Sequence, residues 1–298
     1  MFILQLIILG LPIGILWALL ATSVVMIYRA SRVLNLAIGG MAMLGAYIMY
    51  QVHAWGVPMP FAVLASLTFG AAFGILMERL LLRPLRDKPI LVSVIMTVGV
   101  LALCTELASV VWGQDERLAP ELFPRGALKF GDAAIGYDRI GVLIITLAIM
   151  AGVVYLFRRT TLGISMRAVS DDRRAALLMG VPADRVSTIT WAIGGVLAAI
   201  AGMLLAPIVR LTPNGLVFQS IPALAAALFG GLVSIELTFA GAMAVGVLWS
   251  VLSGLSVGSF RVSEIVGVQE LAIFLLVITF LFVRWEQLFG SELREEEI

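Results

Sequence analysis

The 298-residue chain is too apolar for a water-soluble protein, because 61% of its residues are hydrophobic, only 13% are charged, and its mean hydropathy is +1.07. Soluble domains carry about 25% charged residues. The formal net charge of +1 gives no electrostatic reason to expect a nucleic-acid partner. A single cysteine, Cys104, and a single histidine, His53, exclude a disulfide framework and offer no ligand cluster for a metal.

The hydropathy pattern predicts an all-α, polytopic transmembrane helical bundle with about nine spans, and it leaves eight or ten open. A bilayer core of about 30 Å requires roughly 20 apolar residues in a helix. The candidate spans are residues 3–27, 33–51, 59–77, 90–112, 140–157, 187–209, 217–235, 237–255 and 266–283. The whole chain, residues 1–298, is then a single transmembrane domain.

The second and seventh spans contain paired glycines, so each could be broken or re-entrant, and the glycine-rich second span is expected to be so. Backbone groups that a break sets free need water or protein partners within the membrane, which favours a place on a translocation pathway for Asn35, Gly39 and Gly40. Glu106 is the acidic residue deepest inside a span. Intramembrane acids usually face the bundle interior, so we expect Glu106 to make a structural hydrogen bond there or to line the pathway.

Two later spans carry small residues at every fourth position, on one helix face each. These residues are Gly194, Ala198 and Gly202, and then Ala242, Gly246, Ser250 and Gly254. Small residues at this spacing allow the backbones of neighbouring helices to approach closely. Both spans are therefore expected to pack tightly against other helices, either in fixed contacts or in contacts that also permit sliding during transport.

Basic residues are distributed unevenly between the loops of a nine-span topology. Fourteen of the twenty fall on one side and six on the other. The positive-inside rule then places the N-terminus outside and the C-terminus in the cytoplasm of a bacterial inner membrane. The extracytoplasmic loop, residues 113–139, is expected to form a small hairpin or a short helix, serving either as a docking surface or as a simple connection.

The cytoplasmic loop, residues 158–187, contains a short apolar segment among basic residues. Asp171 or Asp172 can cap a short helix, and Gly180 can end it. The apolar segment is Ala175, Ala176, Leu177, Leu178 and Met179, and the basic residues around it include Arg167, Arg173 and Arg174. Such a segment suits the groove of a partner protein, although a helix lying on lipid headgroups explains the pattern equally well.

This loop resembles the cytoplasmic coupling loop of permease subunits of ABC importers, in which two alanines are followed by three residues and a glycine. Ala175, Ala176 and Gly180 have that spacing. The wider pattern T-x-L-G-x-x-M-R-A-V-x-x-D-x-x-A-A-x-x-M-G-V, residues 160–181, resembles the branched-chain amino-acid type of permease. The N-x-A-x-G and G-A-Y elements of residues 35–39 and 45–47, and R-P-L-R at residues 83–86, agree with this resemblance.

The resemblance implies a permease subunit that pairs with a second, related permease and forms half of a translocation pathway. Two cytoplasmic ATPase subunits, which bind the ATP, would dock on the loop that contains Arg167, Asp172 and residues 175–180, and an extracytoplasmic solute-binding protein would deliver the solute. The chain itself is then no enzyme and carries no cofactor. Branched-chain amino acids, urea, amides and aromatic acids all remain open as solutes. The alternative class is a self-sufficient secondary transporter or channel for a small polar solute.

Overall fold

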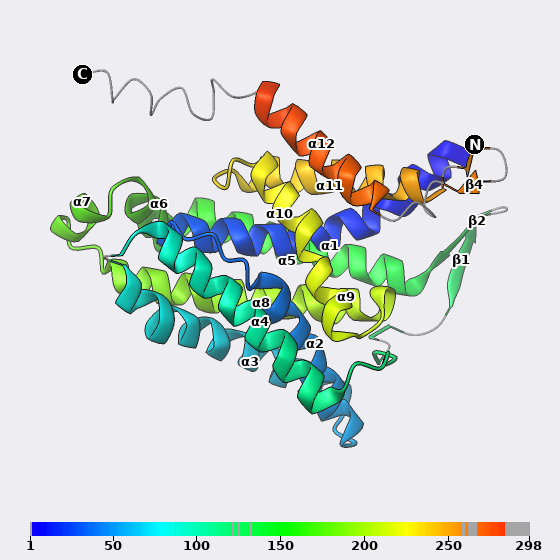
Figure 1. Ribbon diagram of the computed structural model, residues 1–298, viewed down its shortest axis with the longest axis horizontal. Coiled ribbons are helices and arrows are strands. Elements are labelled where there is room, and N and C mark those ends of the chain that lie inside the picture. The colour runs from blue at the N-terminus through cyan, green and yellow to red at the C-terminus, as the bar shows by residue number, and fades with distance from the viewer. Residues whose placement is uncertain are drawn as a thin grey trace.

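The computed structural model describes residues 2–86, 88–120, 122–123, 126–130, 133–254, 256–257, 260–261 and 267–283, which form a helical bundle (Figure 1). The longer helices are α1 (Phe2–Ser31), α2 (Ile38–Ala54), α3 (Met59–Leu76), α4 (Ile90–Trp112), α5 (Tyr137–Arg159), α8 (Ala183–Val209), α11 (Ile235–Gly254) and α12 (Val268–Val283). The shorter helical segments are η1 (Met77–Leu82), η2 (Arg83–Leu85), α6 (Thr161–Asp171), α7 (Arg173–Leu178), α9 (Pro213–Phe218) and α10 (Ser220–Phe229).

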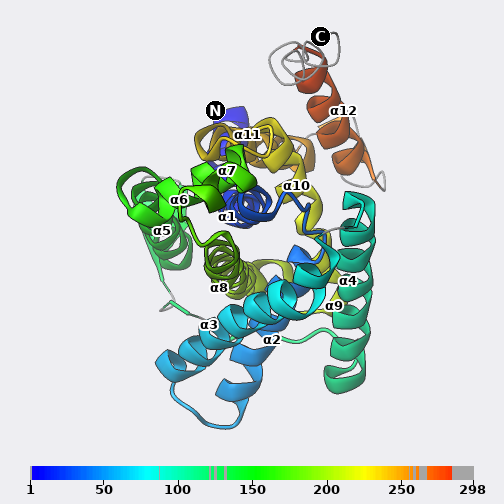
Figure 2. The same cartoon turned by 90° about the vertical axis from the view of Figure 1, so that its left-hand side faces the viewer.

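Helix α1 lies at the centre of the bundle and is in contact with α5, α6, α8, α10 and α11 (Figure 2). Its polar side chains are bonded to helices that follow much later in the chain. Trp17 donates its indole N–H to Oε1 of Gln219 at 2.9 Å, and the Ser23 hydroxyl donates to the carbonyl of Gly194 at 2.7 Å. These bonds satisfy polar groups that water cannot reach inside an apolar bundle.

The helices around α1 pack with their backbones almost in contact. A Cβ atom placed on Gly202 of α8 would lie 1.9 Å from the carbonyl oxygen of Ala42 in α2. On Gly246 of α11, it would lie 2.4 Å from Cα of Gly14 in α1. The small-residue pattern of the two later spans therefore marks tight helix–helix contacts, as the sequence predicts.

Six helices among the described residues are long and apolar enough to cross a membrane, so the structure supports a multi-pass membrane protein. The remaining predicted spans correspond to shorter helices: α2 has 17 residues, and α12 has 16. The predicted span of residues 217–235 overlaps the end of α9 and all of α10, which meet at Gln219 and form a shorter apolar stretch that ends at Phe229, so a full crossing there stays a prediction. A count of nine crossings stays a prediction.

The break in the glycine-rich second span lies ahead of its glycines, not at them. Arg32 has a positive φ of 56° at the end of α1, and residues 33–37 are irregular. Helix α2 begins at Ile38 and continues through Gly39 and Gly40, where the absence of a side chain lets α2 pack closely against Val217 and Cys104. The predicted helix break at the paired glycines was therefore wrong in position.

The two ends of the bundle differ in structure (Figure 1). Strands β1 (Ala127–Phe130) and β2 (Ala133–Gly136) pair antiparallel between α4 and α5, which confirms a small hairpin in the loop of residues 113–139. A second short pair, β3 (Ser256–Val257) and β4 (Phe260–Arg261), follows α11. Helices α6 and α7 lie at the opposite end. The C-terminal residues 284–298, predicted to be cytoplasmic, lie outside the described residues.

Candidate functional site

The loop of residues 158–187, predicted to be cytoplasmic, contains α6 and α7, and local sequence signals determine where α7 begins and ends. The Asp172 carboxylate accepts hydrogen bonds from the backbone N–H groups of Arg174 at 2.7 Å and Ala175 at 3.0 Å. This N-cap satisfies donors that have no partner within the helix. After Met179, Gly180 takes a left-handed conformation with φ of 83°, which ends the helix. The predicted capped, glycine-terminated short helix is confirmed, with Asp172 as the cap.

The surface of α7 that faces away from the bundle is apolar. Leu178 is 89% exposed, Met179 is 84% exposed, and Leu177 is half exposed, whereas Ala176 is buried against the bundle. Ala175 and Gly180 are also exposed. We refer to Leu177, Leu178 and Met179 as the apolar tip. Large side chains exposed to this degree and grouped at one place mark an interaction surface.

The loop is held on the bundle by arginine side chains that donate to backbone carbonyls. Arg32, just after α1, donates from Nε to the carbonyl oxygen of Ser170 at 3.2 Å, and its Nη2 bonds to the same oxygen. Arg167 donates to the carbonyl of Phe157 near the end of α5. Because both carbonyls lie near helix ends, they have no partner within their helices and accept these donors readily.

One carboxylate connects α7 to two other parts of the bundle. Asp184, in the first turn of α8, pairs with Arg83 at 3.1 Å and also with Arg86 and Arg173. We refer to these four residues as the Asp184 cluster. Arg173, expected from the sequence to surround the apolar tip, is instead bonded to Asp184, so only the exposed Arg174 remains beside the tip as predicted.

A buried acid extends the Asp184 cluster into the bundle. Glu78 has a side chain that is 1% exposed, and it pairs with Arg86 and accepts a hydrogen bond from the Thr188 hydroxyl at 2.7 Å. Its position in the π-helical turn η1 brings it next to α8. Sequence reasoning missed this pair. The available signal was an acid eight residues ahead of an arginine at the end of an apolar span.

The predicted pathway residues at the start of α2 are buried in this structure. Asn35 is completely buried; its Oδ1 accepts from the N–H of Ala37 at 3.0 Å and its Nδ2 faces Sδ of Met41 at 3.4 Å. A Cβ on Gly39 would lie 2.9 Å from the carbonyl oxygen of Val217, and one on Gly40 would lie 3.0 Å from Cβ of Cys104. The start of α2 therefore packs against α9 and α4.

Glu106 does not join this group. It is exposed on the surface of α4, whereas Cys104 and Ala108 are buried on the opposite side of the same helix. The expectation that Glu106 faces the interior of this chain's bundle was therefore wrong. The helical repeat of about 3.6 residues places Glu106 well away from the buried face of α4.

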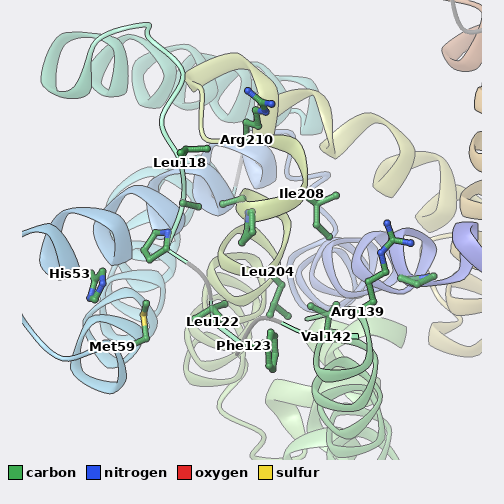
Figure 3. Close-up of a pocket in the computed structure, with 16 residues that line it drawn as sticks. His53, Met59, Leu118, Leu122, Phe123, Arg139, Val142, Leu204, Ile208 and Arg210 are labelled. Atoms are coloured by element: carbon green, nitrogen blue, oxygen red, sulfur yellow. The ribbon is translucent and has the colours of Figure 1, made fainter. Parts of the chain in front are cut away.

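A cavity of about 930 Å³ opens at the end of the bundle opposite α7 (Figure 3). It lies between the α2–α3 turn, the start of α5, the end of α8 and the loop after α4; we refer to it as the outer cavity. Its walls are mostly apolar, with Leu122, Phe123 and Leu204 among them, and its polar side chains include Arg139 and Arg210. Arg210 is paired with Glu116 at 2.7 Å. Sequence reasoning did not anticipate this cavity, because its walls come from segments far apart in the chain.

Comparisons with known proteins agree with these features. Residues 6–286 match the family described as branched-chain amino acid transport system / permease component. The chain is 30% identical to the high-affinity branched-chain amino acid transport system permease protein BraD of Pseudomonas aeruginosa, over 80% of this chain and 82% of that protein. It is 28% identical to the corresponding LivH protein of Escherichia coli over 90% of each chain. The fructose import permease protein FrcC of Rhizobium meliloti is 28% identical over 72% of this chain and 61% of that protein.

No solved structure matches the chain significantly. The family match nevertheless covers α1 through α12, including the capped helix α7 and the glycine contacts around α1. The chain therefore belongs to the family of branched-chain amino acid transport permease components, and it is a membrane permease subunit of an importer.

Proposed function

We propose that this permease subunit forms half of the membrane pathway for a branched-chain amino acid or a closely related small solute, and that separate ATPase subunits drive it. The observation that carries the proposal is the apolar tip on α7, which the bundle holds in place but leaves uncovered. The branched-chain amino acid names of the relatives BraD and LivH support this class of solute.

The apolar tip is the proposed docking element for an ATPase subunit. Protein interfaces concentrate their binding energy in a few buried anchors surrounded by a polar rim. Leu178 and Met179 supply anchors with most of their surface free to be buried, and the exposed Arg174 supplies a basic rim residue. An ATPase groove with apolar walls and an acidic edge is complementary to this surface.

The Asp184 cluster is the proposed route by which movement of α7 reaches the membrane helices. Arg173 joins α7 to the first turn of α8 through Asp184, and Arg83 and Arg86 join the same carboxylate to the segment that follows α3. Because Arg86 also pairs with the buried Glu78, displacing α7 pulls on α3 and α8 together. Contiguous ion-pair networks are one means by which coupling is carried between rigid helices.

The outer cavity is the proposed entry compartment for the solute. Apolar walls suit a branched aliphatic side chain, and Arg139 provides positive charge for a carboxylate, whereas the charge of Arg210 is already paired with Glu116. From there we place the pathway beside Asn35, Gly39 and Gly40. Support comes from the irregular backbone of residues 33–37, which needs polar neighbours at membrane depth.

The proposed orientation puts α6 and α7 in the cytoplasm and the outer cavity outside a bacterial inner membrane. The uneven distribution of basic residues between the loops supports this orientation. The positions of α7 and the outer cavity at opposite ends of α5 and α8 also support it (Figure 1). A second related permease and two ATPase subunits would complete the complex. An extracytoplasmic binding protein would deliver solute at the cavity end, where the β1–β2 hairpin is also found.

Substitution of Leu178 by Asp tests the proposal. We expect the variant to lose co-purifying ATPase and uptake of radiolabelled leucine by about tenfold or more, because a buried anchor is worth about 2 kcal/mol or more and an unpaired charge is costly at an interface. Leu178→Met, which keeps an apolar side chain, is the matched control and should retain both.

Retention of ATPase binding and uptake by Leu178→Asp would show that α7 is not the docking element and would favour its lying on the membrane surface. Leucine uptake by this chain without any ATPase subunit would instead favour the self-sufficient transporter. If the wild-type complex hydrolyses ATP but does not take up leucine, a competition screen with urea, amides and aromatic acids identifies the solute.

A further inference from the structure

The outward face of α4 combines an acidic residue with apolar surroundings. Glu106 is exposed, and along the same face Leu103 is 64% exposed and Val110 is 83% exposed. Glu106 lies about 9 Å along the helix axis from Trp112, the last residue of α4, at a rise of about 1.5 Å per residue. Apolar residues therefore flank it on both sides along the span, and a short Glu side chain reaches no aqueous edge without crossing them.

The other acids of the described long helices, Asp138 of α5 included, lie in the first turns of their helices. Glu236 lies in the first turn of α11 and pairs with Arg158 at 2.5 Å. Glu270 lies in the first turn of α12, and Asp184 belongs to the ion cluster at the start of α8. Glu106 is thus set apart among the described span residues, because it lies well inside its helix and points away from this chain's own bundle.

The same face is shaped for close contact with another helix. A Cβ added to Gly99, two turns before Glu106, would meet no atom within 4 Å, so the backbone there is open to the outside. Ala102, also exposed, lies between them. Small residues allow transmembrane helices to approach closely enough for van der Waals contact and interhelical hydrogen bonds. A carboxylate exposed to lipid is unfavourable, whereas one that faces a protein donor is satisfied.

We infer that this face of α4 (Ile95, Gly99, Leu103, Glu106 and Val110) packs against a transmembrane helix of a second, non-identical membrane subunit, which places a hydrogen-bond donor or a cation opposite Glu106. The inference rests on the proposed function, in which two permease subunits share the pathway. A second copy of this chain fits the face poorly. A two-fold axis along the membrane normal that passes beside α4 brings the two Glu106 carboxylates together, and like charges at an interface are repulsive.

Photo-crosslinking in the assembled importer tests the face directly. A photoreactive amino acid at Val110, with Glu106 unchanged, should form an adduct with the second permease subunit of the complex, identified by mass spectrometry. The matched control is the same label at Ile144, which is exposed on α5, and it should give no such adduct. Adducts at Val110 with lipid only, or with a second copy of this chain, would overturn the inference.

Charge reversal tests the role of Glu106. Glu106→Lys should reduce co-purification of the second permease subunit by about tenfold or more, whereas Glu270→Lys, an exposed acid on α12, should leave it unchanged. Normal pairing in Glu106→Lys would contradict a donor or cation opposite this residue. The crosslink at Val110 decides the question even if the Lys variant does not fold.

Leucine uptake by the unmodified complex is measured separately. An absence of leucine uptake combined with the expected crosslink would count against the proposed solute and leave the interface intact. Leucine uptake combined with an adduct to lipid only would support the proposed solute and overturn the proposed interface.

Discussion

Gly195 in α8 and Gly99 in α4 are both helical glycines inside apolar spans, yet their surroundings are opposite. A Cβ on Gly195 would lie 2.0 Å from the carbonyl oxygen of Gly70 in α3, whereas one on Gly99 would meet nothing within 4 Å. The first glycine allows a contact within the chain. The second lies on α4, whose main contacts within the chain are with α2 and α9, and it leaves an open surface there. Glycine in a membrane helix therefore marks close approach, but not which molecule approaches.

The largest expected effect comes from filling the contact between α3 and α8. Gly195→Leu should prevent folding, because α3 and α8 must separate to admit the side chain and overpacked interiors are strongly destabilised. Fluorescence-detected size-exclusion chromatography in detergent should show aggregated or no subunit. Gly152→Leu is the matched control, since a Cβ there meets nothing within 4 Å on α5. A monodisperse Gly195→Leu subunit at wild-type yield would mean that the α3–α8 contact is not required.

A smaller loss is expected from breaking the buried pair between Glu78 and Arg86. Arg86→Met leaves the Glu78 carboxylate buried with only the Thr188 hydroxyl as partner, which costs about 3 kcal/mol or more. Thermal unfolding in detergent measures this loss. Arg79→Met, on the exposed side of the same turn, should change stability by less than about 0.5 kcal/mol.

Adding Glu78→Gln to Arg86→Met should recover part of the lost stability, because a neutral amide is cheaper to bury than a carboxylate. Unfolding of Arg86→Met at the wild-type temperature would show that the pair contributes nothing. No recovery in the double variant would place the loss elsewhere in the Asp184 cluster.

The smallest expected effect on the subunit itself is at Gly99. Gly99→Ala should raise the stability of the isolated subunit slightly, by up to about 1 kcal/mol, since alanine favours helix and the position is open. Gly99→Leu should leave the isolated subunit folded but weaken its pairing with the second permease subunit. A clear loss of stability in the isolated Gly99→Ala subunit would mean that this position is already packed within the chain.

The sequence predicted the features that depend on nearby residues. Apolar runs located the long helices, the small-residue spacing in α8 and α11 identified their tight contacts, and Asp172 and Gly180 marked the ends of α7. Hydropathy and helix capping depend on residues that are close together in the chain, so both can be recognised in a single sequence.

Features that depend on distant pairings could not be predicted in the same way. Arg86 and Asp184 are 98 residues apart, so nothing local indicates their contact. The exposed position of Glu106 depends on which side of α4 meets α2, and α4 is apolar on every side, so no amphipathic stripe marks a buried face.

The central position of α1 has a consequence for biosynthesis. This helix is made first, but its Ser23 bonds to a residue made 171 positions later, its Trp17 to one made 202 positions later, and the Leu6 carbonyl to Ser250, 244 positions later. At about 5–20 residues per second, α1 waits on the order of tens of seconds for these partners. During that time these groups lack the partners that they have in the finished subunit. A nascent chain stalled before α11 therefore leaves the side of α1 that packs on α11 uncovered, although α1 is the innermost helix of the finished subunit.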